Sequence, residues 1–298
     1  MAKSFLHLRP FLTLLAWLCL GFSPAFAQST QVQYLSGLGK DDPVKWDFQC
    51  TRGRNSGKWT KIGVPSNWEL QGFGTYSYGF AKEDPEEAGL YRRTFSVPAA
   101  WKQKHIFIVF DGSMTDTEVK VNGQLAGPIH QGSFYRFRYD ITPLLKVGQK
   151  NLLEVTVHKV STNATVNDAE RTADFWVFGG IYRPVFLEAY PEQYLERIAL
   201  DAKADGSLRL DAYLGNARTA TTVQAQVKTR AGQPVGAPIT ATVAPGSTQV
   251  QLTGQVANPA LWSPEFPNLY RVEVTLKDGT TTLHTLTETL GFRTVELR

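Results

Sequence analysis

The sequence predicts an all-β protein built from two consecutive domains. Short runs rich in β-branched and aromatic residues recur along the chain, with Gly-containing turn dipeptides between them, and no window of 12 or more residues shows a convincing helical period. Near residue 191 the composition changes from aromatic-rich to rich in Thr, Val, Ala and Gln, which indicates the boundary between the two domains.

The first 27 residues have the pattern of a secretory signal peptide. A basic start is followed by an apolar run over residues 11–22, and Ala25-Phe26-Ala27 is a small-x-small cleavage site. The run is shorter than the roughly 20 residues that a membrane-spanning helix needs. We therefore expect a secreted or periplasmic chain that starts at Gln28 and has no membrane segment, with an uncleaved N-terminal anchor as the alternative.

Charge and cysteine content argue against several classes of function. The formal net charge of +4 falls to +2 without Lys3 and Arg9, so there is no electrostatic case for binding nucleic acid or anionic lipid. Cleavage leaves Cys50 as the single cysteine, which excludes an internal disulfide and predicts a small core residue. The histidines show no metal-ligand spacing, and no phosphate-binding Gly-rich loop or Gly-x-Ser-x-Gly motif occurs.

The first domain is predicted to span residues 28–191. His105–Asp111 is apolar on both faces, as expected of a strand inside a sandwich. Asn122-Gly123 lies between strand-like runs and predicts a tight hairpin, because both residues tolerate positive φ. Residues 181–190 close the domain, and Pro184 marks their early part as an edge or as the approach to a strand, since proline cannot donate to a β-ladder.

The second domain is predicted to span residues 192–292, after a linker at Pro191–Tyr194. Its strand-like runs are short and closely spaced, with turn signals such as Asp205-Gly206 and Pro245-Gly246 between them. This spacing is typical of a small immunoglobulin-like sandwich. The expected strands are Ser207–Tyr213, Thr222–Thr229, Thr248–Gly254 and Tyr270–Leu276.

A series of short motifs carries a resemblance to a known family. The motifs are Val64–Glu69 (VPSNWE), Tyr91–Phe95 (YRRTF), Phe110–Gly112, Val119–Gly123, Asp140–Thr142, Gly179–Pro184 (GGIYRP), Leu261–Pro264 (LWSP), Asn268–Tyr270 and Gly291–Arg293. In order and spacing they resemble the non-catalytic N-terminal region of glycoside hydrolase family 2, which contains β-galactosidases, β-glucuronidases and β-mannosidases. The resemblance covers essentially the whole mature chain.

The resemblance implies a jelly-roll sugar-binding domain, then an immunoglobulin-like domain, then a (β/α)₈ barrel. In the family the barrel carries two glutamates that hydrolyse a glycosidic bond with retention, one as general acid/base and one as nucleophile. Five residues follow Arg293. By the resemblance we therefore expect residues 293–298 to lead toward a barrel that this chain lacks, and we expect neither catalytic glutamate within it.

Neighbouring carboxylates in the chain are interpreted as solvated loop charges instead of catalytic acids. Adjacent side chains on an extended backbone point to opposite sides, so such pairs do not converge on one bond. The pairs are Asp41-Asp42, Glu83-Asp84, Glu86-Glu87 and Asp168 with Glu170, all in polar, turn-like segments.

The resemblance also implies three substrate-binding residues: Tyr78, Asp174 and Trp176. Asp174 matches an aspartate that contacts substrate hydroxyls in β-galactosidase-like members, and a carboxylate accepts strong hydrogen bonds from such groups. Trp176 offers an apolar face to a sugar ring. The alternatives are that Asp174 holds a loop against Arg183 or Arg171, and that Trp176 serves packing alone.

Other residues of these loops are interpreted as structural, and one departs from the family pattern. Asn67, Trp68 and Arg183 are expected to be a turn amide, a core indole and a buried guanidinium. β-Galactosidase-like members often place an Asn two residues after the first-loop tyrosine, whereas this chain has Phe80. An apolar ring cannot make the contact of an amide, so the sugar is left open.

We therefore interpret the chain as the N-terminal portion of a secreted, β-galactosidase-like glycosidase of carbohydrate catabolism. It would contribute substrate-site loops and barrel support for a β-glycoside substrate. The alternatives are a stand-alone carbohydrate-binding module and a structural partner of a separately encoded barrel, which an exposed apolar patch on the second domain would support. No cofactor ligand is visible, and the resemblance allows Mg²⁺ or Na⁺ and a homo-oligomer in the intact enzyme.

Overall fold

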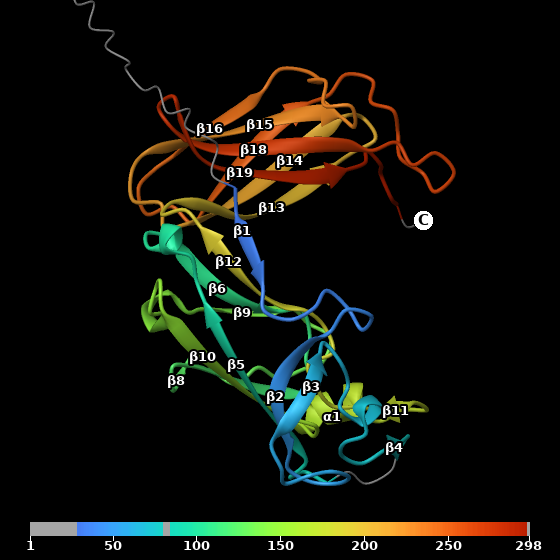
Figure 1. The fold of residues 1–298 in the computed structure, drawn as a ribbon. Coiled ribbons are helices and arrows are strands. Elements are labelled where there is room, and N and C mark those ends of the chain that lie inside the picture. The colour runs from blue at the N-terminus through green and yellow to red at the C-terminus, as the bar shows by residue number, and fades with distance from the viewer. Residues whose placement is uncertain (1–28, 80–83, 297–298) are drawn as a thin grey trace, which may run out of the picture.

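Two β-sandwiches follow one another along the chain in the computed structural model (Figure 1). The structure describes residues 29–79 and 84–296, so the predicted signal peptide lies outside the described residues. Each sandwich has its own cluster of buried apolar side chains. The prediction of an all-β chain, with a jelly roll before an immunoglobulin-like sandwich, is confirmed.

The first sandwich consists of a six-stranded and a four-stranded antiparallel sheet. The larger sheet comprises β2 (Val44–Cys50), β3 (Thr60–Val64), β5 (Ala88–Ser96), β7 (Asp116–Val121), β8 (Gln124–Leu125) and β10 (Lys150–His158), in the order β3-β2-β5-β10-β7-β8. The smaller comprises β1 (Gln31–Tyr34), β6 (His105–Phe110), β9 (Phe137–Asp140) and β12 (Val185–Tyr190), in the order β1-β12-β6-β9. Short helices connect them: η1 (Glu69–Gln71), η2 (Ala99–Trp101), η3 (Thr142–Leu144) and α1 (Ala164–Glu170).

Strand alternation separates the core of this sandwich from its surface. Phe48, Tyr91, Val155 and Val119 are register partners across β2, β5, β10 and β7, and all four are buried. The next row, on the opposite face, is charged: Asp47, Arg92, Glu154 and Lys120. This two-residue period is what a half-buried strand requires.

The local predictions for the first domain are confirmed. Asn122 and Gly123 have φ of 53° and 81° and join β7 to β8 in a tight hairpin. Strand β12 begins at Val185, directly after Pro184, and then pairs with both β1 and β6 in the middle of its sheet. Proline therefore occupies the approach to the strand, where its missing N–H does no harm.

The second sandwich pairs a three-stranded sheet with a four-stranded one. The first comprises β13 (Tyr194–Ala202), β14 (Ser207–Gly215) and β17 (Gln249–Gln255); the second has the order β16-β15-β18-β19, with β15 (Thr221–Thr229), β16 (Ile239–Val243), β18 (Tyr270–Asp278) and β19 (Thr281–Leu290). The four expected strands are present. The sequence analysis did not name β13, β16 and β19, which are polar and half-exposed along much of their length. No helix in the described part of the chain is long and apolar enough to cross a membrane.

A buried histidine joins the two sandwiches. His284 on β19 is fully buried, and its Nδ1 accepts the backbone N–H of Leu195 at 3.1 Å. Nε2 lies 3.1 Å from the Thr30 hydroxyl. The rings of Tyr190 and Tyr194 pack edge-on against the imidazole. Burial, with a smaller contribution from the charge of Lys104, lowers the pKa of His284 from 6.5 to about 4.

This junction predicts a specific loss of stability in mild acid. The unfolded chain binds a proton at His284 near pH 6.5, whereas the folded chain does so only near pH 4. The free energy of unfolding should therefore be unaffected by this group above pH 6.5 and fall by about 3 kcal/mol as the pH drops toward 4. In urea titrations, His284→Asn should flatten that part of the profile, while His158→Asn, at an exposed site, should keep the wild-type slope. Equal slopes in all three proteins would contradict the assignment.

Candidate functional site

A small ribbon outside the large sheets carries two of the predicted site residues. β4 (Ser77–Tyr78) pairs antiparallel with β11 (Trp176–Val177), and Tyr78 stands opposite Trp176. Because side chains alternate along a strand, Ser77 and Val177 are buried, whereas Tyr78 and Trp176 are 48% and 51% exposed. In Figure 1 the ribbon lies at the end of the first sandwich that is distant from the second.

Tyr78, Asp174 and Trp176 form one exposed group, which we call the aromatic–carboxylate cluster. The Tyr78 hydroxyl donates to Asp174 Oδ1 at 2.6 Å, and its ring centroid lies 4.9 Å from that of Trp176. The Tyr76 ring packs edge-on against Trp176, with centroids 5.5 Å apart. Tyr78 therefore contacts both of the other residues that the sequence analysis selected, although they lie in a distant segment.

The cluster has the chemistry of a site that binds hydroxylated rings. A carboxylate has about four lone-pair positions, so the bond from Tyr78 leaves Asp174 able to accept from a ligand. The exposed indole of Trp176 adds an apolar face and an N–H donor beside it. Hydrolysis with retention needs two carboxyl groups about 5–5.5 Å apart. The cluster supplies one carboxylate, which suits binding but not hydrolysis.

The structure corrects the expectation for Arg183. It is exposed, its guanidinium lies 5.1 Å from the centroid of the Tyr182 ring, and it does not form the predicted buried group. It lies just beyond the buried Gly180, whose φ of 116° turns the chain before β12. Asp174 is exposed and accepts its hydrogen bond from Tyr78.

The expectations for Asn67 and Trp68 are confirmed. Trp68 is fully buried, and its indole Nε1 donates to Glu87 Oε1 at 3.0 Å. Asn67 Nδ2 donates to the Gly179 carbonyl at 3.3 Å, which ties the first site loop to the second. On the other side, Arg54 and Gly74 exchange backbone hydrogen bonds, and the Arg54 guanidinium lies 5.0 Å from the Tyr76 ring centroid.

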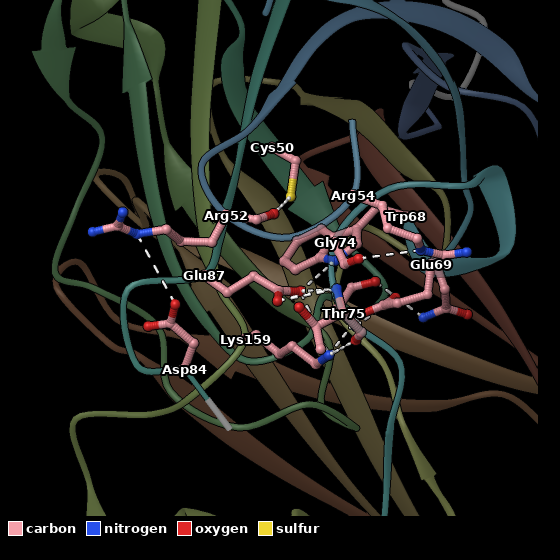
Figure 2. Close-up of polar contacts among 12 residues, drawn as sticks. Cys50, Arg52, Arg54, Trp68, Glu69, Gly74, Thr75, Asp84, Glu87 and Lys159 are labelled. Carbon is pink, nitrogen blue, oxygen red and sulfur yellow. Dashed lines mark hydrogen bonds and ion pairs between the residues drawn. The ribbon is translucent and has the colours of Figure 1, made fainter. Parts of the chain in front are cut away.

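Beneath the ribbon lies a buried network of charge made by Glu69, Glu87 and Lys159 (Figure 2). Each of these side chains is at most 1% exposed. The Lys159 ammonium is 3.0 Å from Glu69 Oε1 and 3.5 Å from Glu87 Oε1. We call these three residues the buried charge network. Its two carboxylates are enclosed by protein, so no glycoside can reach them as a catalytic pair.

The buried charge network corrects the interpretation of Glu86-Glu87 as solvated loop charge. Glu86 is exposed, but Glu87 directly precedes β5 and points inward, as alternation requires. The sequence analysis also missed Lys159, although it continues the alternation that buries Leu153, Val155 and Val157. Glu69 was visible only as part of the VPSNWE motif.

Backbone N–H groups stabilise the charge of both carboxylates. Thr75 N–H donates to Glu87 Oε1 and Oε2 at 3.2 and 3.1 Å, and Gly179 N–H donates to Glu69 Oε1 and Oε2 at 3.0 and 3.1 Å. Burial raises the pKa of Glu69, and Lys159 and the Gly179 N–H oppose that rise. The nearby Cys50 thiol is buried, as predicted, and burial raises its pKa to about 11, which leaves it unreactive.

A third buried carboxylate fixes the segment that leads to Asp174. Asp116 accepts hydrogen bonds from the Ser161 hydroxyl at 2.6 Å, from the Thr162 N–H at 2.9 Å and from Gln131 Nε2 at 3.1 Å. Beyond it, Glu170 at the end of α1 accepts the Ser133 N–H at 2.7 Å. Glu170 is therefore a structural anchor. Asp168 is exposed, as predicted, but it lies on α1 and not in a loop.

The remaining chemistry of the described residues is limited. No group of three or more His, Cys, Asp or Glu side chains within residues 29–79 and 84–296 is placed to hold a metal ion.

A hollow of about 610 Å³ lies on the second sandwich, between Leu200, Trp262, Leu290 and Arg293. Three exposed apolar side chains occur in the same region of the chain, Leu261, Phe266 and Val295.

Comparison with known families matches both sandwiches to one family. Residues 49–191 match the profile described as the sugar binding domain of glycosyl hydrolases family 2, and residues 193–293 match a second profile of glycosyl hydrolases family 2. Together the two matches cover most of the chain.

Individual relatives agree with these matches. The chain is 30% identical to a β-galactosidase of Priestia megaterium over 268 residues, which are 81% of this chain and 25% of that protein. It is 31% identical to a β-galactosidase of Clostridium acetobutylicum over 263 residues, 80% and 28% of the two chains. A crystal structure of a Bacteroides uniformis β-glucuronidase superimposes with a TM-score of 0.70 at 25% identity, over 88% of this chain and 32% of that one. The chain thus spans about a quarter of the length of the curated relatives it matches.

The contact between Tyr78 and Asp174 predicts an observable titration. The hydrogen bond to the Asp174 carboxylate favours the neutral phenol and raises the pKa of Tyr78 above its usual value of 10. In Asp174→Asn the carboxylate is absent, so the titration midpoint of the Tyr78 phenol should return toward about 10. NMR titration with ¹³Cζ-labelled tyrosine measures it, with Tyr78→Phe identifying the signal. Asp168→Asn, an exposed carboxylate on α1, is the matched control, and an unchanged midpoint in Asp174→Asn would show that the contact is absent in solution.

Proposed function

This chain belongs to glycoside hydrolase family 2, and on that basis we propose that it is the substrate-binding N-terminal part of an exported, β-galactosidase-like glycosidase that cleaves O-glycosyl bonds with retention. The observation that carries the proposal is the aromatic–carboxylate cluster of Tyr78, Asp174 and Trp176. It is exposed, it is built by two loops far apart in the sequence, and it lies within the part of the chain that matches a sugar-binding domain.

Each member of the cluster has a distinct role in this proposal. Asp174 accepts hydrogen bonds from sugar hydroxyls, and Tyr78 holds the carboxylate in one orientation at 2.6 Å. Trp176 covers the apolar face of the ring. A β-galactoside is the first ligand to test, because two of the relatives are β-galactosidases.

The catalytic acid pair belongs, in this proposal, to a barrel outside these residues. Two features support it: the chain spans about a quarter of its curated relatives, and the two carboxylates that Lys159 joins, Glu69 and Glu87, are inaccessible. The hollow on the second sandwich and the exposed Leu261, Phe266 and Val295 provide an apolar surface of the kind that packs against another domain. A barrel encoded in the same chain or as a separate partner would bury it.

A stand-alone carbohydrate-binding module is the second candidate function, and one observation favours it. The aromatic–carboxylate cluster is assembled entirely from residues of this chain, so weak glycan binding does not require a barrel. Binding by the isolated chain is compatible with either function. Hydrolysis is not, since it requires an acid pair that reaches the substrate.

We predict that the purified chain from Gln28 binds a β-galactoside weakly and hydrolyses none. Asp174→Asn should weaken binding by about tenfold or more, because a hydrogen bond to a charged group contributes about 1.5–3 kcal/mol. Trp176→Ala should also weaken binding, because it removes the apolar face that covers the sugar ring. Titration calorimetry or ligand-observed NMR at millimolar sugar measures this. Trp59→Ala is the matched control, since Trp59 is 44% exposed but lies elsewhere on the first sandwich.

The hydrolysis arm of the experiment uses a panel of nitrophenyl glycosides with the same protein. No release of nitrophenol is expected. Turnover that a carboxylate substitution within residues 28–298 abolished would overturn the assignment of the acid pair to a barrel. Equal affinities in Asp174→Asn and Trp59→Ala would remove the cluster from the sugar site.

A further inference from the structure

The ribbon of β4 and β11, which carries Tyr78 and Trp176 of the aromatic–carboxylate cluster, cannot determine its own position. Strands β4 and β11 have two residues each, and the ribbon is not hydrogen-bonded into either large sheet. An isolated two-stranded pair is marginally stable in water. The placement of Tyr78 opposite Trp176 therefore depends on contacts made by the segments that flank the ribbon.

The buried charge network contacts those flanking segments at matching positions. Thr75 lies three residues before Tyr78, and Gly179 lies three residues after Trp176. Glu87 accepts the Thr75 N–H with both oxygens, while Lys159 Nζ donates to the Thr75 carbonyl at 2.5 Å. Glu69 accepts the Gly179 N–H with both oxygens. Figure 2 shows Glu69, Glu87 and Lys159 converging around Thr75.

We propose that Lys159, Glu69 and Glu87 are positioning residues for the aromatic–carboxylate cluster. One carboxylate holds the segment before β4, the other holds the segment after β11, and the Lys159 ammonium joins the two carboxylates. The ammonium thereby fixes how far apart the two flanks lie, and with it the Tyr78–Trp176 and Tyr78–Asp174 contacts. The effect on sugar binding rests on the proposed function, whereas the effect on ribbon geometry does not.

The chemistry of the network suits positioning better than it suits stability. A buried ion pair is weak evidence for stability, because apolar residues of similar volume often stabilise a protein equally well. An apolar replacement cannot accept the N–H groups of Thr75 and Gly179, which would then be unpaired. Carboxylates that each accept one N–H with two oxygens constrain the direction of that bond as well as its length.

Amide hydrogen exchange on the full mature chain tests this without a sugar. Glu87→Gln should accelerate exchange at Thr75 more than at Gly179, and Glu69→Gln should do the reverse. Lys159→Met should accelerate both, by about tenfold or more relative to amides in the middle of β10. Glutamine keeps one oxygen for the N–H, so the two Gln variants provide the readout if Lys159→Met does not fold.

The matched control is Asp211→Asn, which removes a buried carboxylate that Gln251 and Arg209 contact in the second sandwich. It should leave the ratio of loop to β10 exchange unchanged. Uniform acceleration of all amides in the network variants, or unchanged exchange at Thr75 and Gly179, would overturn the proposal.

Sugar titration of the same variants separates this proposal from the proposed function. Lys159→Met should weaken β-galactoside binding by about tenfold, with ¹³C shifts of the Tyr78 ring changing in parallel. If sugar affinity falls while exchange at Thr75 and Gly179 stays at wild-type values, the positioning role is wrong. If the exchange pattern appears but the wild-type chain binds no saccharide, the positioning role stands and the proposed function fails.

Discussion

The need to satisfy buried charge is the constraint on which the exposed ribbon depends. Taking a carboxylate out of water is costly unless it is paired and hydrogen-bonded. Glu69 and Glu87 meet that requirement by accepting backbone N–H groups from the two segments they hold, and by sharing Lys159. The same hydrogen bonds therefore stabilise the carboxylate charges and hold the backbone of the two loops in place. The loops cannot move away without leaving a buried carboxylate without its N–H donor.

The close approach of the loops to this network depends on residues without side chains. Trp68 fills the space beneath them, and a Cβ at Gly179 would lie 2.1 Å from its indole. At Gly74, which has a φ of 66°, a Cβ would lie 2.5 Å from Glu87 Oε1. In the GGIYRP motif, Gly180 turns the chain with a φ of 116°, and Gly179 makes room for a buried aromatic ring.

The two sandwiches divide the tasks of scaffold and site. Both have closed apolar cores, and the polar and aromatic groups capable of recognising a ligand lie on loops at the end of the first sandwich. Loops held by a rigid scaffold are where recognition commonly occurs, because the sheets fix their ends while their side chains vary. The second sandwich contributes its own hollow and the His284 junction instead of further site residues.

The sequence by itself determined the elements with a strong local signal and supplied the candidate residues for the site. A run that is apolar on both faces identified β6, and Asn122-Gly123, whose residues tolerate positive φ, identified a hairpin. These two predictions succeeded because a strand pattern or a turn conformation is a property of a few adjacent residues. The motif resemblance singled out Tyr78, Asp174 and Trp176 as candidate site residues, and the structure brings them near one another. Polar, half-exposed strands such as β19 lack such a signal and went unnamed.

Only the tertiary structure decided which charges are buried and which distant residues meet. Glu87 and Lys159 are 72 positions apart, and Tyr78 and Asp174 are 96 positions apart. No local pattern distinguishes Glu87 from its solvated neighbour Glu86, and the alternation that continues into Lys159 does not identify the carboxylates that pair with it. The physical reason is that burial and pairing arise when separate strands pack together, so they depend on the arrangement of the whole fold.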